Sequence, residues 1–302
     1  MVFNIPCYAR FQWINHRRVR DILRIALRPP RIGRKGYDKV RMFKWLMYKQ
    51  VMGCSYRDLE GMTGIDHSTF VKFRSRLIRQ NWFAVVYHGL TSGIAPQLHS
   101  ITAILDSSFV ETYSRHDEQG SEYNGFKEKN GFKLHQLIDF QTRLPLCQIA
   151  TPGARSDIRI GEVLIRGAPR TWKIRKFTAD KGYDGANFVK FVSAYWPGIR
   201  ISIPLRHMKK DELLVWRRIK GWERTWDRQL LKKRTEIERY FSRKKRVFGL
   251  GEERTRHLKN FRANCELTSI MEILEWSTKP QIYGDYSPDS ESPAFDYLVT
   301  LC

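Results

Sequence analysis

Three acidic residues, Asp106, Asp180 and Glu238, combine residue type and local context in a way that suits chemistry on phosphodiester bonds. Carboxylate oxygens are good ligands for Mg²⁺ and Mn²⁺. Two such ions about 3.5–4 Å apart activate an attacking water or 3′-hydroxyl and stabilise the leaving oxygen of an in-line displacement. The residue types therefore predict a carboxylate site for two divalent ions, provided that the fold brings the acids together.

Two apolar runs are the elements that must position the aspartates. Asp106 follows the run 101–105, and Asp180 follows the run 174–179. If both runs are strands and lie side by side, the two carboxylates meet at one end of a sheet, where rigid elements hold ligands in register. Taken singly, each aspartate has a simpler interpretation. Asp106 could open a loop, and Asp180 could be a turn residue whose role Asp184 shares or replaces.

Glu238 lies in a basic stretch, 232–246, that has a helical pattern. An apolar stripe runs along it from Ile237 to Phe248, and Glu236 and Glu238 flank this stripe symmetrically at 100° per residue. Periodicity alone therefore leaves the choice between the two glutamates open. A solvated helix of mixed charge, held by side-chain pairs, is the alternative to a site.

The overall charge indicates a polyanionic partner. The chain of 302 residues has 54 Lys and Arg against 31 Asp and Glu, a formal net charge of +23 at pH 7. Nucleic acid is the most economical partner, because cationic side chains release counterions from its phosphates. A ribosome-like structural protein or an anionic membrane surface are the alternatives, but neither needs three carboxylates placed after extended segments.

Composition also excludes several classes of protein. The hydrophobic share of 42% is ordinary for a globular chain, which at this length is expected to hold two domains. The five cysteines are scattered and form no Cys-x-x-Cys pair, so neither a zinc site nor a disulfide framework is indicated. No signal-peptide core or membrane-spanning run is present in the sequence. We therefore expect a cytoplasmic protein that does not interact with a membrane.

Residues 1–98 are expected to form a helical, basic domain that binds DNA. Helical spacing predicts helices over 17–28 and 39–52. The segment 55–78 then resembles two short helices joined by a turn at Gly64, which is the pattern of a helix-turn-helix. An ordinary helical hairpin is the alternative.

Capping residues and the distribution of charge support the prediction of two helices in this segment. Ser55 can cap the first short helix, with Asp58 in its first turn, and Asp66 or Ser68 can cap the second. In the second helix an apolar face is expected to point inward and a basic face outward to contact DNA. The inward residues are Phe70, Phe73 and Leu77, and the outward residues are Lys72, Arg74 and Arg76.

From residue 99 to 278 the pattern changes to an α/β domain. Strands are predicted over 100–105, 131–140, 144–150, 174–179 and 199–205, and helices over 156–165, 186–195, 211–248 and 263–276. The hairpin among them predicts a mixed sheet. The tail 279–302 is rich in proline and acids and is expected to be peripheral.

This second half resembles the DDE transposases of prokaryotic insertion sequences, which have a ribonuclease-H-like catalytic core. The matching segments are Leu105–Ser108, Gly131–Asp139, Thr151–Asp157, Thr178–Gly185 and Arg234–Phe241. The resemblance covers about residues 35–276, because the N-terminal helices also resemble the DNA-binding region of the family. It implies an RNase-H-like mixed sheet flanked by helices, preceded by an all-α, helix-turn-helix-like domain.

The family's Tyr–Arg–Glu–Lys motif has an arginine four positions before the glutamate and a lysine seven after it. Arg234, Glu238 and Lys245 fit both spacings, so the resemblance selects Glu238 over Glu236. The family tyrosine would fall at Leu231, where this chain departs from the motif. The short stretch between Asp180 and Glu238 leaves no room for the inserted domain that some relatives carry.

The resemblance implies an Mg²⁺- or Mn²⁺-dependent enzyme that binds terminal inverted repeats, hydrolyses strands at the element's ends and joins the freed 3′-hydroxyl to target DNA. It also implies a homodimer on double-stranded DNA and a prokaryotic, nucleoid-associated protein. Two rival hypotheses remain at this point: a catalytically inactive DNA-binding relative, and an RNase-H-like nuclease without strand transfer. All three acids are present, which favours the transposase over the inactive relative.

Further residues are weaker candidates. Lys133 and His135 match a Lys-x-His pattern of the family and alternate onto one face of their strand, so they either contact DNA near the metals or belong to a plain sheet surface. Asp157 is expected to cap a helix. The cations expected to follow DNA phosphates after the last strand are Arg206, Lys209 and Lys210.

Overall fold

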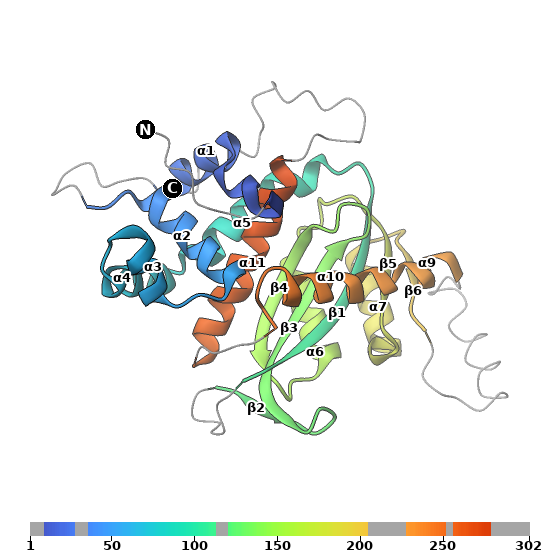
Figure 1. Ribbon diagram of the computed structural model, residues 1–302. Coiled ribbons are helices and arrows are strands. Elements are labelled where there is room, and N and C mark those ends of the chain that lie inside the picture. The colour runs from blue at the N-terminus through green and yellow to red at the C-terminus, as the bar shows by residue number, and fades with distance from the viewer. Residues whose placement is uncertain (1–8, 28–35, 113–119, 205–227, 252–255, 279–302) are drawn as a thin grey trace. The chain divides into compact units, whose positions relative to one another are not determined.

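The computed structural model describes residues 9–27, 36–112, 120–204, 228–251 and 256–278 (Figure 1). These residues divide into two compact units by their internal contacts. The first unit holds 9–94, 247–249 and 263–278, and the second holds 95–246 and 250–262. The domain boundary predicted after residue 98 stays a prediction. The tail 279–302 and the cations Arg206, Lys209 and Lys210 lie outside the described residues.

Helices make up the first unit. They are η1 (Ala9–Asn15), α1 (Arg17–Ala26), α2 (Lys39–Met52), α3 (Tyr56–Thr63), α4 (His67–Arg79), α5 (Trp82–Ile94) and the part of α11 (Leu258–Thr278) from residue 263 onward. Phe43, Phe70 and Phe83 are fully buried in this unit. The helix predicted over 39–52 is confirmed at both ends, whereas the one predicted over 17–28 ends at Ala26.

Local hydrogen bonds explain the α3–turn–α4 segment. The Ser55 hydroxyl accepts a hydrogen bond from the Asp58 backbone N–H at 3.1 Å, and the Asp58 carboxylate accepts one from Ser55 N–H at 2.6 Å. Gly64 ends α3 with φ +68°, a left-handed conformation that glycine adopts without strain. Asp66, rather than Ser68, caps α4. The two short helices predicted from the sequence are therefore present.

A mixed sheet forms the centre of the second unit. Its strands are β1 (Ile101–Glu111), β2 (Glu122–Asn124), β3 (Lys129–Asp139), β4 (Pro145–Pro152), β5 (Ile174–Ala179) and β6 (Arg200–Ser202). The order is β2-β3-β1-β5-β6, with β4 also paired to β3. β1, β3 and β4 are antiparallel, and β5 and β6 continue the sheet in parallel with β1. The predicted RNase-H-like α/β fold is confirmed.

Helices flank this sheet. They are α6 (Asp157–Gly167), α7 (Ala186–Tyr195), α9 (Arg228–Lys233) and α10 (Thr235–Arg246), and α10 runs across the strands in Figure 1. The continuous helix predicted over 211–248 is wrong within the described residues. Arg234 forms a turn between α9 and α10, and its N–H donates to the Leu231 carbonyl. Residues 211–227 of that predicted helix are outside the description.

The first strand is longer than the strand predicted over 100–105. β1 does not end before Asp106 but continues to Glu111, because β3 pairs with it as far as the partners Glu111 and Gly131. The parallel pairing with β5, in contrast, stops at Leu105 and Ala179. Asp106 therefore lies where the neighbouring strand ends, in the middle of its own strand.

Close packing of α6 on the sheet generates a stability prediction. A Cβ atom at Gly161 would lie 2.9 Å from the Tyr183 ring, 3.2 Å from Leu105 and 3.3 Å from Phe188. Gly161→Ala should therefore lower the free energy of unfolding by about 1–3 kcal/mol through overpacking. Gly167→Ala, at the end of the same helix and with nothing within 4 Å, should leave it unchanged or raise it by up to ~1 kcal/mol. Urea denaturation measures both, and equal effects of the two variants would contradict the prediction.

Candidate active site

The pairing of β1 with β5 places two of the three acids side by side. Leu105 and Ala179 are the last partners of this parallel pair, and Asp106 and Asp180 are the next residue on each strand. Asp180 keeps an extended backbone, with φ −69° and ψ 161°. Burial raises the pKa of Asp106, and the charge of Asp180 adds to that rise.

Arg234 connects the third acid to this pair. Its Nη1 atom lies 3.5 Å from Oδ1 of Asp180 and 3.0 Å from Oε1 of Glu238. The side chain of Glu238 is 58% exposed and that of Asp180 is 40% exposed, whereas Arg234 is mostly buried. One guanidinium group thus lies between two carboxylates from β5 and α10.

The neighbouring glutamate has a different environment. Glu236 is buried, and its carboxylate pairs with Arg143 at 2.7 Å and with Arg239 at 3.3 Å. The apolar stripe that includes Ile237 is buried between the two glutamates. Glu238 is therefore the glutamate of α10 that lies beside Asp180, and Glu236 belongs to an ion-pair cluster.

The electrostatics of Asp106 are unusual for an aspartate. Burial raises the pKa of its carboxyl to about 7, and the charges of Asp180 and Asp157 add to this rise. The Ser107 backbone N–H, which donates to Oδ1 of Asp106 at 2.7 Å, opposes the rise, and so does the charge of Arg234. At neutral pH the carboxyl is therefore protonated in a large fraction of molecules, which reduces its repulsion with Asp180.

The donor set fits a hard divalent cation. All three acids offer oxygen atoms, which Mg²⁺ prefers, and the Arg234 guanidinium already occupies a cationic position between two of them. The three carboxylates are not at direct ligand spacing: in the described part of the chain, only Glu60, Asp66 and His67 bring three ligand atoms within 4.8 Å of one another. Binding a shared ion would require Arg234 to move away from its carboxylate partners.

The Glu60–Asp66–His67 group lies in the α3–α4 segment and has a structural explanation. Glu60 and His67 form an exposed pair at 2.8 Å, and Asp66 is the cap of α4. Each of these side chains thus already has a protein partner.

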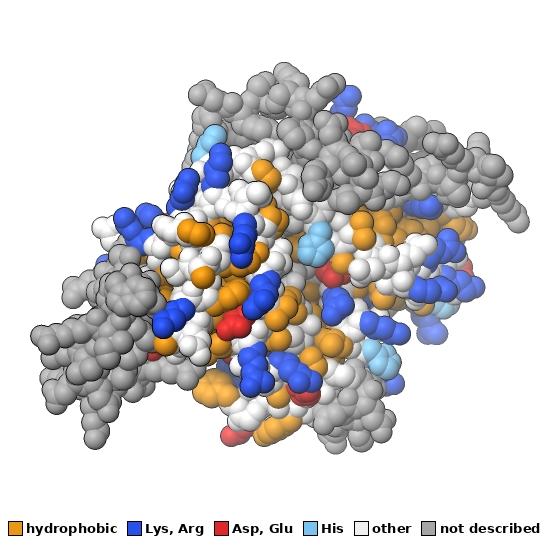
Figure 2. All heavy atoms as spheres, turned by 180° about the vertical axis from the view of Figure 1, so that it is seen from behind, with side chains coloured by type: hydrophobic (Ala, Val, Ile, Leu, Met, Phe, Trp, Pro, Cys, Tyr) orange, Lys and Arg blue, Asp and Glu red, His pale blue; other side chains and the backbone are white. Residues whose placement is uncertain are grey.

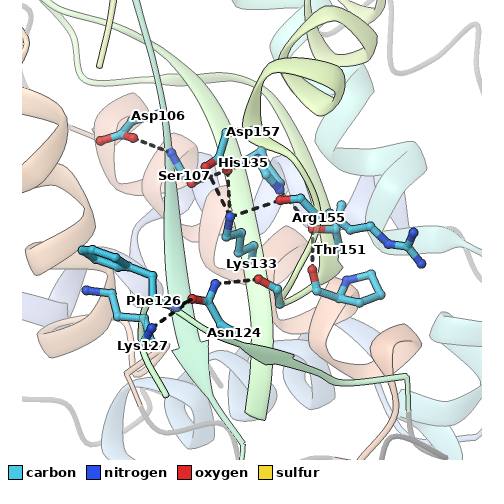
Figure 3. A network of polar contacts seen from close by, with 12 residues as sticks. Asp106, Ser107, Asn124, Phe126, Lys127, Lys133, His135, Thr151, Arg155 and Asp157 are labelled. Atoms are coloured by element: carbon cyan, nitrogen blue, oxygen red, sulfur yellow. Dashed lines mark hydrogen bonds and ion pairs between the residues drawn. The ribbon is translucent and has the colours of Figure 1, made fainter. Parts of the chain in front are cut away.

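A polar network lies behind Asp106, on the other face of β1 (Figure 3). Asp157 of α6 accepts hydrogen bonds from the Ser107 hydroxyl at 2.8 Å and from the Lys133 ammonium at 3.1 Å. His135 Nδ1 lies 3.5 Å from the same carboxylate, and its Nε2 is 3.0 Å from the Thr151 hydroxyl. The expected helix-cap role of Asp157 is wrong, since Ser156 occupies the cap position and Asp157 begins the helix.

This network places Lys133 and His135 away from the face that carries Asp106. His135 pairs with Ser107 across the strands and Lys133 with Phe109, so their side chains share the Ser107 face, whereas Asp106 alternates to the opposite face. His135 is fully buried, and burial lowers its pKa to about 4, so its imidazole is neutral. Both residues support Asp157 in this structure.

Two residues of the site escaped the sequence analysis. Ser107 joins both faces of β1, because its N–H binds Asp106 and its hydroxyl binds Asp157. Tyr183 is buried among the acids, and its pKa is raised by burial and by the charges of Asp157, Asp106 and Asp180. Both lie shortly after an acidic candidate, in the segments Leu105–Ser108 and Thr178–Gly185 that resemble the family, but neither was singled out.

The remaining candidates are distributed over both units. Lys245 of α10 donates from Nζ to the Phe109 carbonyl at 2.8 Å, and Leu231 is a half-buried residue of α9. On α4, Phe70, Phe73 and Leu77 are buried as predicted, and Lys72 and Arg76 are exposed. Arg74 is half-buried and donates to the Asn264 side chain at 2.7 Å.

Comparison with known proteins identifies the class. Residues 98–271, more than half of the chain, match the family described as the transposase DDE domain, and the chain belongs to this family. Among solved structures it is similar to a piggyBac transposase in a synaptic complex with hairpin DNA. The identity is 12% and the TM-score 0.47, over 97% of this chain and 78% of that one. The search of curated proteins found no match.

The family defines an enzyme of the nuclease and phosphoryl-transferase type, a transposase. The three acids selected from the sequence lie within the matched region. The structure places Asp106 beside Asp180 at the end of β5, and Arg234 links Asp180 to Glu238. None of the described helices is both long and apolar enough to cross a membrane.

The raised pKa of Asp106 generates a prediction about the metal-free protein. The folded carboxyl titrates near 7 and the unfolded one near ~3.9, so the unfolded state ionises first as pH rises. The contribution of Asp106 to stability is therefore complete below pH ~4 and is lost as pH rises towards 7. An asparagine side chain in place of this carboxyl cannot ionise and avoids the loss.

Asp106→Asn should accordingly gain stability relative to the unmodified protein between pH 5 and pH 8, by about 1–4 kcal/mol. Urea denaturation in the presence of EDTA at both pH values measures the difference, and subtraction removes the titration of all other groups. The same difference at pH 5 and pH 8 would contradict the assigned shift.

Proposed function

We propose that this protein is a metal-dependent DNA transposase of an insertion sequence. In this proposal it binds the terminal inverted repeats, cleaves phosphodiester bonds at the ends and transfers the 3′-hydroxyl strand to target DNA. The observation that carries the proposal is the convergence of Asp106 and Asp180 at the end of β5, with Glu238 joined to Asp180 through Arg234. Membership of the transposase DDE domain family supports the same reaction.

Asp106, Asp180 and Glu238 would hold the divalent metal, Mg²⁺ or Mn²⁺, as two ions. When bound, such ions supply an activated water or hydroxyl and stabilise charge on the leaving oxygen. Asp106 must lose its proton to act as a ligand, which its pKa of about 7 allows near neutral pH. Arg234, once separated from its two carboxylates, would present its guanidinium to a phosphate oxygen next to the cleaved bond.

Exposed cations are proposed to bind the DNA. On α4, Lys72 and Arg76 stand on the face opposite the buried Phe70, as the second helix of a helix-turn-helix requires. Arg234 and Lys245 would contact phosphates beside the acids. The face that is turned away from the viewer in Figure 1 also carries many lysine and arginine side chains, with few acidic side chains among them (Figure 2). Such a surface attracts a polyanion.

Not every predicted DNA contact enters this proposal. His135 is fully buried and Lys133 is tied to Asp157, so we assign them to the support of Asp157 instead. Arg74 is held by Asn264 and would position α4 within its unit. Because the reaction uses two DNA ends, the protein would act as a homodimer that pairs them. Binding to DNA in a prokaryotic cell would place it at the nucleoid.

Paired substitutions in one helix test the site. Glu238→Gln and Asp106→Asn should each reduce Mg²⁺-dependent nicking of DNA ends by at least ~100-fold, because one oxygen ligand loses its charge. Glu236→Gln, the same change two residues away, should keep nicking within a few-fold, since Glu236 pairs with Arg143 and Arg239 and not with Arg234 among the described residues. Gel assays with labelled end DNA measure nicking, and thermal unfolding checks that each variant is folded.

Retention of nicking by Glu238→Gln, or equal losses in both glutamate variants, would overturn the assignment. The same assay with added target DNA detects strand-transfer products. Nicking without any transfer product would favour the nuclease alternative over the transposase.

The contribution of α4 to DNA binding is tested separately. Lys72→Ala and Arg76→Ala should each weaken binding of end DNA and lower the slope of log K against log salt concentration by roughly 1, because one phosphate contact is lost. Lys190→Ala, at an exposed lysine of α7, serves as the charge-matched control and should leave the slope unchanged. Filter binding at several salt concentrations gives these slopes. Unchanged slopes in the α4 variants would remove α4 from the interface.

A further inference from the structure

The turn between β2 and β3 presents an aromatic ring to solvent. Phe126 is 88% exposed, the largest value among the exposed large hydrophobic residues of the described chain. Single exposed apolar residues are common and need no explanation by themselves. The surroundings of Phe126, however, are specific in their hydrogen bonds and in their charge.

Hydrogen bonds hold the turn in one conformation. The Asn124 side-chain oxygen accepts from the backbone N–H groups of Phe126 at 3.1 Å and Lys127 at 3.0 Å. The Asn124 side-chain nitrogen donates to the Gly153 carbonyl at 2.7 Å, which anchors the turn to the end of β4 (Figure 3). Because the backbone of this turn is already held, it loses little further conformational freedom when a partner binds at Phe126.

One cation lies beside this ring. The Lys127 ammonium lies 5.2 Å from the centre of the Phe126 ring. Burial lowers the pKa of Lys245, and the charge of Lys127 lowers it further. Like charges at short distance repel each other, and a bound polyanion relieves that repulsion.

The position of Lys245 links the turn to the acids. Lys245 is on α10, seven residues after Glu238, which is about 10 Å along a helix axis. Its ammonium is bound to the Phe109 carbonyl of β1, the strand that carries Asp106. In the view of Figure 3, Phe126 and Asp106 project to the same side of β1. A DNA strand that follows α10 away from the acids would therefore reach Phe126 within a few nucleotides.

We propose that Phe126 is a stacking platform for an unpaired base of the DNA end bound at Asp106, Asp180 and Glu238, with Lys127 and Lys245 binding the adjacent phosphates. This inference rests on the proposed function, because it needs DNA at the three acids. Stacking of a base on an aromatic side chain contributes ~1–3 kcal/mol and tolerates any base, since every base has a π-face. The cations provide the phosphate contacts that accompany such stacking.

The test uses the full-length protein and duplexes that end in the inverted repeat flanking its own reading frame. 2-Aminopurine replaces one nucleotide at a time near the end, and Ca²⁺ replaces Mg²⁺ to prevent cutting. Stacking on Phe126 should quench the fluorescence at one or two adjacent positions. Phe126→Ala should abolish this quenching and weaken end binding roughly 5–150-fold, which corresponds to ~1–3 kcal/mol. Phe126→Trp should retain both.

Val163→Ala, which removes an exposed apolar side chain from α6, is the matched control and should change neither signal. Quenching that survives in Phe126→Ala, with affinity within two-fold, would overturn the stacking role. If the unmodified protein still nicks the ends in Mg²⁺, the proposed function stands in that case. A protein that neither binds nor nicks these ends would refute both proposals.

Discussion

The site depends on the repulsion between two carboxyl groups on adjacent parallel strands. Asp106 and Asp180 follow the last partners of β1 and β5, so neither can move away without disrupting the sheet. The protein limits this repulsion in two ways. The half-buried Asp106 holds a proton up to about pH 7, and Arg234 neutralises Asp180 and Glu238. A divalent cation would take the place of both the proton on Asp106 and the guanidinium of Arg234. This arrangement therefore suits metal binding.

Side chains alternate between the two faces of β1, so the adjacent residues Asp106 and Ser107 contact different parts of the protein. Asp106 faces α10 and the other acids, whereas Ser107 faces α6 and binds Asp157. The Ser107 N–H also donates to the Asp106 carboxylate, so Ser107 connects the site to the network of Asp157, Lys133 and His135. Such a network restricts the position of the backbone at Asp106, and preorganised ligands lose little entropy when an ion binds.

Much of the fold was predictable because its signals are local. The bounds of α2, β5 and α7 agree with the apolar periodicity, and the caps of α3 and α4 follow from side chains within three residues of each helix start. Predictions failed where pairing decides the outcome. β1 extends beyond Asp106 because β3 continues alongside it, and the helix around Arg234 is broken where its side chain turns towards Asp180.

The sequence by itself determined which acids to consider and, through a family motif, the spacing of Arg234, Glu238 and Lys245. Periodicity could not separate Glu236 from Glu238, because both flank the same apolar stripe of α10. The tertiary structure separates them: Arg143, from the turn between β3 and β4, pairs with Glu236, while Glu238 shares Arg234 with Asp180. The partners that distinguish the two glutamates are distant in sequence, and only the packing of α10 across the sheet brings each within ion-pair distance.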